Sequence, residues 1–297
     1  MDHFAKLNGI LVLDKPAGMS SAQAVDHVKR AFRVKRAGHG GTLDPIATGV
    51  LAICLGEGTK IAQYLLADDK AYRAELVLGR ETDTLDRTGE TVAEHDASHV
   101  TREMIAAGLS AHLGEQDQIP PMYSAIKQDG VRLYKQARRG IEVDRPPRRI
   151  RIDRLALIAF APGLVPRVTI EMACSKGTYV RSLVDDLGRE LGCGAHLAEL
   201  RRTQSGIFSI DQAQQPDALD PGGLLAIEAC LRLPVVLAPA ELVPFIRSGL
   251  QLKLDQLSGL PTEGTQFQLI DPSAKLVAIA HATSEKIVYD RVFGESL

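Results

Sequence analysis

In its first fifty residues the chain reads Ala37-Gly-His-Gly-Gly-Thr-Leu-Asp-Pro-Ile-Ala-Thr-Gly49. Four glycines and a proline within 13 residues exclude a regular helix and a central strand. The stretch therefore predicts a loop, and the apolar run Val50–Leu55 continues it as a strand. Loops on a rigid scaffold often hold functional side chains. Asp44 is the carboxylate of this loop, but Asp-Pro also commonly begins a turn, so the pattern alone leaves both interpretations open.

The segments around this loop alternate between helical and extended patterns. A buried strand is predicted at Gly9–Leu13, and a helix begins after Ser20 or Ser21 and runs to about Arg36. Further along, we predict helices at Lys60–Ala67 and Thr178–Leu191 and strands at Tyr72–Leu78, Ile150–Phe160 and Val165–Cys174. Beyond Pro234, short strands separated by turn residues indicate a small β domain. We therefore expect a main domain over residues 1–235 and a second over 236–297.

The composition is that of a water-soluble globular protein, with 45% hydrophobic and 24% charged residues among 297. No stretch approaches the roughly 20 apolar residues of a membrane helix, and the N-terminus lacks a signal-peptide pattern. The four cysteines are scattered and form no Cys-x-x-Cys pair, so we expect no zinc site. These features favour a cytoplasmic protein.

Charge is unevenly distributed along the chain. The net charge is −2, but the segment from Arg132 to Arg154 has nine Lys and Arg against three acids, which leaves −8 for the remainder. A basic stripe on an acidic body suits phosphate binding, because neutralised phosphates release counterions. A run of charge can also be an ordinary solvated face, so composition alone does not choose between the two.

Common catalytic signatures are absent from the sequence. There is no Gly-Lys dipeptide and hence no Walker loop, no Gly-x-Gly-x-x-Gly and no Gly-x-Ser-x-Gly. These absences argue against nucleotide triphosphate, dinucleotide and serine-hydrolase chemistry, and leave the Asp44 loop as the candidate site.

Five ordered motifs resemble one family. The stretch from His39 to Leu51, together with Lys15-Pro16-x-Gly18, Pro120–Lys127, Cys174–Arg181 and Gly192–His196, resembles the bacterial tRNA pseudouridine-55 synthases (the TruB-type family) over roughly residues 8–202. The resemblance implies an α+β fold: a mixed, largely antiparallel sheet flanked by helices, with a PUA-like C-terminal β domain. It implies isomerisation of uridine to pseudouridine at position 55 in the T-arm loop of tRNA, with no cofactor and no metal, by a protein that we expect to be monomeric.

The resemblance also assigns roles to single residues. Asp44 matches the family nucleophile, Arg181 its guanidinium partner, and Tyr179 the tyrosine that handles the C5 proton. The target base must leave its stack to be reached, so the enzyme needs a pocket with an apolar or aromatic face. The residues with which the family binds the flipped base or its surroundings correspond here to His39, Tyr72, Leu200 and Lys15. Tyr179 is expected to bind the substrate as well as to take part in catalysis.

RNA contact is expected in two further regions. Residues 127–151 match the position of a basic insertion that closes on the T-arm, and its candidates for backbone contact are Arg138, Arg139, Arg148, Arg149 and Arg151. The C-terminal part resembles a PUA domain only through Arg247-Ser-Gly249 and Arg291-Val-Phe293, and it is acidic for an RNA-binding domain.

Three other functions fit parts of the pattern. A guide-dependent pseudouridine synthase would share the catalytic core, although the basic insertion and the short C-terminal domain favour a stand-alone enzyme. A tRNA-folding chaperone with secondary catalysis would share the RNA-binding surface. A carboxylate glycosidase would need a second acid near Asp44, for which Glu57 and Asp68 are the candidates.

Overall fold

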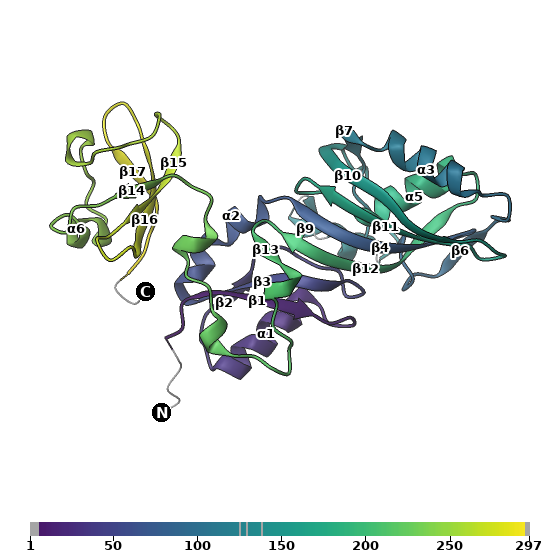
Figure 1. The fold of residues 1–297 in the computed structure, drawn as a ribbon, viewed down its shortest axis with the longest axis horizontal. Helices are drawn as coiled ribbons and strands as arrows, with labels where there is room; N and C mark the ends of the chain where they lie inside the picture. The colour runs from purple at the N-terminus through teal and green to yellow at the C-terminus, as the bar shows by residue number, and fades with distance from the viewer. Residues whose placement is uncertain (1–5, 125, 129, 138, 295–297) are drawn as a thin grey trace.

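The computed structural model describes residues 6–124, 126–128, 130–137 and 139–294. Within these residues the largest sheet has nine strands, and its central path runs β1-β3-β12-β4-β11-β10-β7 (Figure 1). The strands of this path are β1 (Gly9–Lys15), β3 (Thr48–Leu55), β4 (Lys70–Leu78), β7 (Gly114–Gln118), β10 (Arg148–Ala161), β11 (Arg167–Cys174) and β12 (Ala195–Ser205). Two short strands extend it, β2 (Ala37–His39) on β3 and β13 (Phe208–Ser209) on β12. The mixed, largely antiparallel α+β fold predicted from the resemblance is confirmed.

Strand β12 joins the two halves of the sheet. It pairs antiparallel with β4 over nearly its whole length and parallel with β3 through Arg201 and Arg202, opposite Thr48 and Gly49. Strand β3 pairs antiparallel with β1, whose side chains are all buried. The glycine-rich loop therefore enters β3 where three strands meet, and its side chains lie beside β12 and β4.

Helix α1 (Ser21–Phe32) precedes the glycine-rich loop and packs against β2 and β3. Ser20 caps its N-terminus in a capping box with Gln23. The predicted end at about Arg36 is wrong, because Arg33 adopts a left-handed conformation with φ 50° and closes the helix.

Helices α3 (Arg102–Ala111) and α5 (Val180–Glu190) lie together at the other end of the sheet (Figure 1). The apolar stripe of α5 predicted from the sequence is buried at Val180, Leu183, Val184 and Leu187, facing the sheet core. The remaining short elements are η1 (Gly56–Ile61), α2 (Ala62–Leu66), β5 (Arg80–Thr82), β6 (Thr91–Glu94), η2 (Ile210–Gln212), η3 (Pro221–Gly223) and η4 (Glu228–Cys230).

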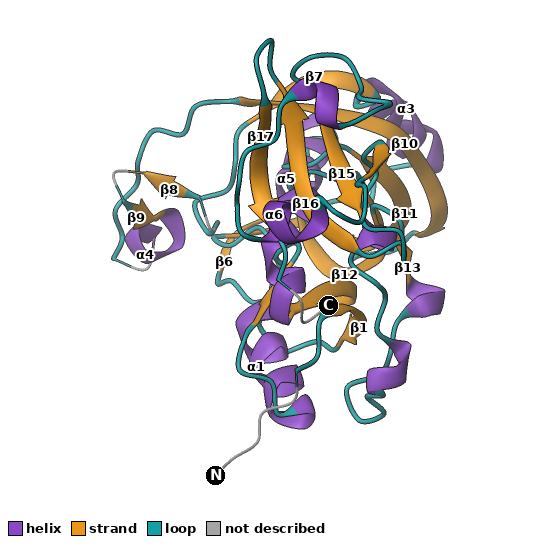
Figure 2. Ribbon diagram, turned by 90° about the vertical axis from the view of Figure 1, so that its left-hand side faces the viewer, coloured by secondary structure: helices purple, strands orange, loops and turns teal. Residues whose placement is uncertain are grey.

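The basic segment divides into two parts. Strands β8 (Lys127–Gln128) and β9 (Val131–Arg132) and helix α4 (Leu133–Ala137) project from the body as a small lobe (Figure 2). Arg148, Arg149 and Arg151 belong to the main sheet instead, on the part of β10 that pairs with β7.

The C-terminal residues form a second sheet with the order β14-β15-β16-β17. Its elements are β14 (Val235–Leu237), α6 (Val243–Arg247), η5 (Leu254–Gln256), β15 (Gln266–Ile270), β16 (Leu276–Ala282) and β17 (Ile287–Val292). The expected boundary at 236 falls inside β14, so the second sheet begins at Val235. Among the described residues, no helix combines the length and apolar character required to cross a membrane.

Candidate active site

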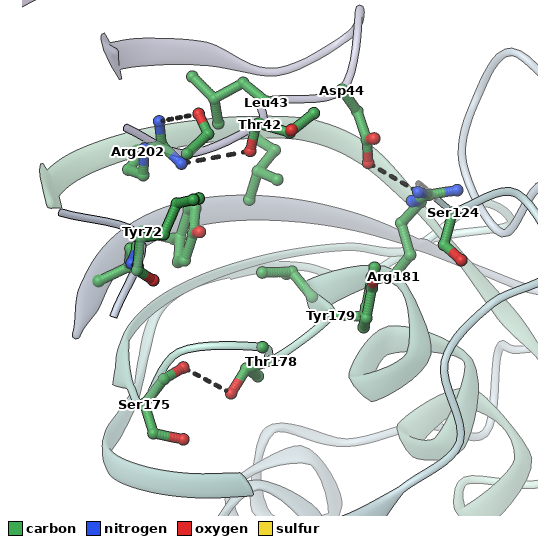
Figure 3. A pocket seen from close by; sticks show the side chains of 16 residues that line it. Thr42, Leu43, Asp44, Tyr72, Ser124, Ser175, Thr178, Tyr179, Arg181 and Arg202 are labelled. Atoms are coloured by element: carbon green, nitrogen blue, oxygen red, sulfur yellow. Dashed lines mark hydrogen bonds and ion pairs between the residues drawn. The ribbon is translucent and has the colours of Figure 1, made fainter. Parts of the chain in front are cut away.

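A cavity of about 270 Å³ lies beneath the glycine-rich loop (Figure 3). Its walls come from that loop, the end of α2, the start of β4, the segment before β8, the start of α5 and β12. Asp44, Tyr72, Tyr179, Arg181 and Leu200, which are far apart in the sequence, all line it. Their convergence on one cavity is what the sequence resemblance led us to expect.

Asp44 and Arg181 form an ion pair inside this cavity, with Asp44 Oδ2 and Arg181 Nη2 2.8 Å apart. The side chain of Arg181 is only 4% exposed, whereas that of Asp44 is 36% exposed and accessible from the cavity. Arg181 Nη1 also donates to the Thr84 carbonyl at 3.1 Å and Nη2 to the Tyr123 carbonyl at 2.8 Å. The guanidinium is therefore held in one orientation while the carboxylate stays open to a ligand.

A second carboxylate, Asp86, lies behind the pair. Its Oδ2 is 3.7 Å from Arg181 Nη1, and its Oδ1 accepts from the Thr88 backbone N–H and hydroxyl. Asp86 is buried, so its charge is compensated chiefly by these contacts. Sequence reasoning missed this residue because it stands in the polar segment from Arg80 to Glu94, which has no helical or strand periodicity.

Opposing effects act on the charge of Asp44. Burial raises the pKa of its carboxyl group, Arg181 lowers it through the ion pair, and the Asp86 charge raises it. The net result is a pKa above the ordinary aspartate value. When it is ionised, a carboxylate of raised pKa is more basic than an ordinary aspartate and so bonds more readily to a substrate.

Two tyrosines and a leucine give the cavity its apolar surface. Tyr72 lies on β4 opposite Met172 of β11 and Arg202 of β12. Tyr179 is the residue before α5. Its backbone N–H donates to Gln118 Oε1 at 2.8 Å, and its carbonyl accepts from Gln118 Nε2 at 3.0 Å. Burial raises the pKa of both tyrosines, so each is a neutral phenol at neutral pH. With Leu200 they provide a flat, uncharged wall suited to a planar base.

The loop that holds Asp44 is fastened from two sides. Ser21 Oγ accepts from the Leu43 N–H at 2.8 Å and donates to the Leu43 carbonyl at 3.0 Å. The buried guanidinium of Arg202 donates to the carbonyls of Val50, Thr42 and Gly41 at 2.7, 3.4 and 3.2 Å. These bonds fix the backbone on both sides of the aspartate.

Two predicted substrate-binding residues do not line the cavity. Lys15 is fully buried, and its Nζ donates to the carbonyls of Pro16 at 2.8 Å and Met19 at 2.6 Å. Burial lowers its pKa to about 8, against the opposing effect of Asp44. His39 is half-buried on β2, and its Nδ1 accepts from the Gly41 N–H at 3.4 Å. Both side chains contact the backbone near the Asp44 loop, so the structure gives them a supporting position.

The predicted RNA-backbone residues lie outside the cavity. Arg149 pairs with Glu115 at 3.0 Å and Asp117 at 3.7 Å, and Arg151 pairs with Asp153 and Asp69. Arg139 and Arg148 are exposed, whereas Arg138 lies outside the described residues. The acids from β7 could not be anticipated from a charge count along β10, because they are more than thirty residues away in sequence.

The structure offers no support for a glycosidase or a metal site within the residues it describes. Asp44 is the only carboxylate among those lining the cavity. Glu57 pairs with Lys60 and Arg36 instead, and Asp68 also lies outside the lining. In the same described ranges, no group of three His, Cys, Asp or Glu side chains is arranged to hold a metal ion.

Comparison with known proteins yields a consistent set of matches. Residues 29–180 match the family model described as TruB family pseudouridylate synthase (N terminal domain), and residues 181–221 match tRNA pseudouridylate synthase B C-terminal domain. A tRNA pseudouridine synthase B from Syntrophotalea carbinolica is 43% identical over 94% of this chain and 93% of that protein. The protein of the same name from Saccharophagus degradans is 41% identical over 95% and 94%.

Solved structures point to the same fold. The crystal structure of a Cbf5-Nop10-Gar1 complex contains a chain with a TM-score of 0.73 and 25% identity, covering 97% of this chain and 85% of that one. An archaeal box H/ACA Nop10-Cbf5 complex gives 0.71 and 25%, with 98% and 86% covered.

Proposed function

Since the chain belongs to the TruB family of pseudouridylate synthases, and is thus a tRNA pseudouridine synthase and an isomerase, we propose that it modifies uridine 55 in the T-arm loop with Asp44 as the nucleophile. The observation that supports this most strongly is the Asp44–Arg181 pair at 2.8 Å, in a cavity lined by Tyr72 and Leu200. A flipped uracil would lie against those two side chains with the carboxylate at its edge.

The chemistry follows from the atoms that must move. Asp44 attacks either the ribose C1′ or the uracil ring, and both routes remain open. The C1′–N1 bond breaks, the base turns, C5 bonds to C1′, and the carboxylate is released. C5 loses its proton and N1 ends with one, so substrate and product are isomers and the reaction consumes no redox equivalent or ATP.

Tyr179 is the residue that we assign to the C5 proton. Burial raises its pKa, so it is a poor phenolate at neutral pH. The phenol can still accept the C5 proton on its oxygen while it gives up its own hydroxyl proton, which ends on N1 of the turned base, and this relay is the role we propose. Arg181 keeps Asp44 ionised and oriented, because it offsets part of the burial cost.

For the T-arm we propose contacts outside the cavity. The small lobe formed by β8, β9 and α4 projects from the body (Figure 2). Arg139 follows α4, and Arg148, at the start of β10, lines a cavity together with Gln128 and Leu133 of the lobe. Arg149 and Arg151 lie on β10 in the main sheet. Phosphate contacts at these arginines would set the register of the RNA on the protein without reading its sequence.

A direct test incubates the protein with an unmodified tRNA transcript, without guide RNA, metal or nucleotide, and maps pseudouridine by position. A transcript with cytidine at position 55 is the matched control. We expect product at position 55 of the first transcript and none in the control. Product elsewhere in the tRNA would contradict the T-arm assignment, and product only after addition of a guide RNA would favour a guide-dependent pseudouridine synthase.

A further inference from the structure

Ser124 has a buried hydroxyl group that no hydrogen bond of full geometry within the described residues satisfies. The residue is 4% exposed and lines the cavity. Within the described residues, Ser124 Oγ is buried and makes no hydrogen bond of full geometry, although it approaches the Tyr179 hydroxyl, which lines the same cavity. A buried hydroxyl without a partner destabilises the fold, because its bonds to water are lost and not replaced. An unpaired polar group in the wall of an active-site cavity points to a ligand that completes it.

The position of this hydroxyl is fixed by its neighbours. The preceding carbonyl, that of Tyr123, accepts from Arg181 Nη2 at 2.8 Å, and the Ser124 N–H donates to the Met122 carbonyl at 2.9 Å. Figure 3 shows Ser124 beside the guanidinium of Arg181. The segment is thus fastened to the same arginine that holds Asp44, which places Ser124 on the polar side of the site.

We propose that Ser124 Oγ hydrogen-bonds to the polar edge of the flipped uracil and keeps that bond while the base turns. This inference rests on the proposed function of the cavity. The Arg181 guanidinium already contacts Asp44, Thr84 and Tyr123, so it has little capacity left for the base. The Ser124 hydroxyl is available for that contact.

The symmetry of uracil explains why a hydroxyl suits this place. The polar edge of the ring runs O2, N3–H, O4. When the base turns about the axis through N3 and C6, N1 and C5 exchange places, and O2 and O4 exchange places with them. A donor that faces one carbonyl oxygen before the turn therefore faces the other after it. A serine hydroxyl rotates freely about its Cβ–Oγ bond, so it can follow small displacements of the ring.

Substitution of Ser124 separates this role from a structural one. Ser124→Ala removes only the hydroxyl. Because Oγ makes no hydrogen bond of full geometry among the described residues, we expect the melting temperature to stay the same or rise. We expect tRNA affinity to change less than twofold, since most contacts are elsewhere, and the single-turnover rate to fall about tenfold, as for the loss of one hydrogen bond to the reacting base.

The matched control is Ser182→Ala. Ser182 is also buried, but its Oγ donates to the Ile119 carbonyl at 3.0 Å and it does not line the cavity. This variant should lower the melting temperature more than it lowers the rate. The proposal is overturned if Ser124→Ala turns over at the wild-type rate, or if its melting temperature falls as far as that of Ser182→Ala. If the wild-type protein itself forms no pseudouridine in any tRNA, the proposed function fails and this inference fails with it.

Discussion

Arg202 shows how much of the active site depends on a residue that need not touch the substrate. It is 1% exposed, and its guanidinium binds three carbonyls that flank Asp44 in the sequence. Its own backbone lies against Gly49, where an added Cβ would stand 2.2 Å from the Arg202 carbonyl oxygen and where φ is +98°. Arg202 and Gly49 therefore fix the path of the loop together.

The first prediction concerns Arg202→Lys. Lysine keeps the charge but has one donor group where arginine has a planar fork, so it cannot satisfy three carbonyls in this geometry. We expect a fall of ten- to a hundredfold in kcat, roughly as for a displaced catalytic group, with the Kd for tRNA within about threefold. Steady-state kinetics and a filter-binding assay measure the two quantities. A variant with normal kcat would show that the loop holds its position without Arg202.

The sequence identified some residues of the candidate site and missed others. Asp44, Tyr179 and Arg181 belong to the ordered motifs, Tyr72 and Leu200 were assigned by the same resemblance, and the fold brings all five to one cavity. By contrast, nothing in the order of residues marks Asp86 or Arg202, and the Pro120–Lys127 motif contains Ser124 without indicating a role for it. Their significance lies in contacts between distant segments, such as Asp86 with Arg181 or Arg202 with Gly41, which only the folded chain reveals.

Among the elements, helix α1 has a part in the site although it contributes no residue to the cavity lining. Its first residue, Ser21, makes two hydrogen bonds to Leu43, next to Asp44. The preceding residue, Ser20, caps the helix and makes no such bond to the loop. Ser20 thus stabilises the helix, whereas the adjacent Ser21 holds the position of the loop.

We expect Ser21→Ala to lower both stability and turnover, because it removes both bonds to Leu43 and leaves buried backbone groups unpaired, at a cost of about 1–3 kcal/mol. Ser20→Ala should cost about 1 kcal/mol for the lost cap and leave kcat unchanged. Thermal unfolding and kcat measured on both variants make the comparison. Equal effects on kcat would mean that the helix as a whole, not the Ser21 bond, positions the loop.

Strand β10 carries the arginines that we propose for RNA contact. Arg149→Glu should weaken tRNA binding and reduce the slope of log K against log salt by about 1 or more, because a phosphate contact is lost. Arg154→Glu is the matched control, on the same strand and likewise exposed and paired with an acid, Glu171. Kd measured across a salt series tests the difference. If both reversals alter the slope equally, the effect reflects net charge and not a contact at Arg149.

The elements themselves were largely predictable because apolar periodicity is a local signal. The α5 stripe and the β1 run are examples. Their pairing was not, since no local pattern states that β12 joins β3 on one edge and β4 on the other. The acids of β7 opposite Arg149 escaped prediction for the same reason.

On the scale of the whole molecule, the C-terminal sheet is packed against the catalytic domain. Leu276, Ile279 and Phe293 belong to the same buried cluster as Ile10 and Val12 of β1. Lys60 donates to the Val292 carbonyl at 2.6 Å, and its Nζ lies 5.2 Å from the centre of the Phe293 ring. The second sheet therefore stabilises the domain that holds Asp44, whatever it contributes to RNA binding.

Phe293→Ala tests that stabilising role. Phe293 is fully buried, and its loss should cost about 3–5 kcal/mol of unfolding free energy through lost burial and a cavity. Phe245→Ala is the control, since Phe245 is 49% exposed on α6 and should cost below about 0.5 kcal/mol. Chemical denaturation of both variants gives the two values. Similar small losses would mean that the two domains are held together by other contacts.

Asp44→Asn should change the melting temperature in a pH-dependent way, and this change serves as a check that the variant is correctly folded. Burial raises the pKa of Asp44, so the ionised carboxylate destabilises the folded state. This penalty is absent below the unfolded pKa of about 3.9 and grows as the pH rises through the higher folded value. Asparagine escapes it. The melting temperature of the variant should therefore exceed that of the wild type at pH 7. The two melting temperatures should become equal below a pH of about 3.9.

The most direct measurement combines that variant with tRNA. Single-turnover assays at pH 7 compare pseudouridine formation by wild-type and Asp44→Asn protein, alongside the Kd of each for the same unmodified transcript. We predict a Kd within about threefold of the wild type, because the side chain keeps its shape and most RNA contacts lie elsewhere, and no detectable pseudouridine. Pseudouridine formed by the folded, tRNA-bound variant at a rate near that of the wild type would contradict the assignment of Asp44 as the nucleophile.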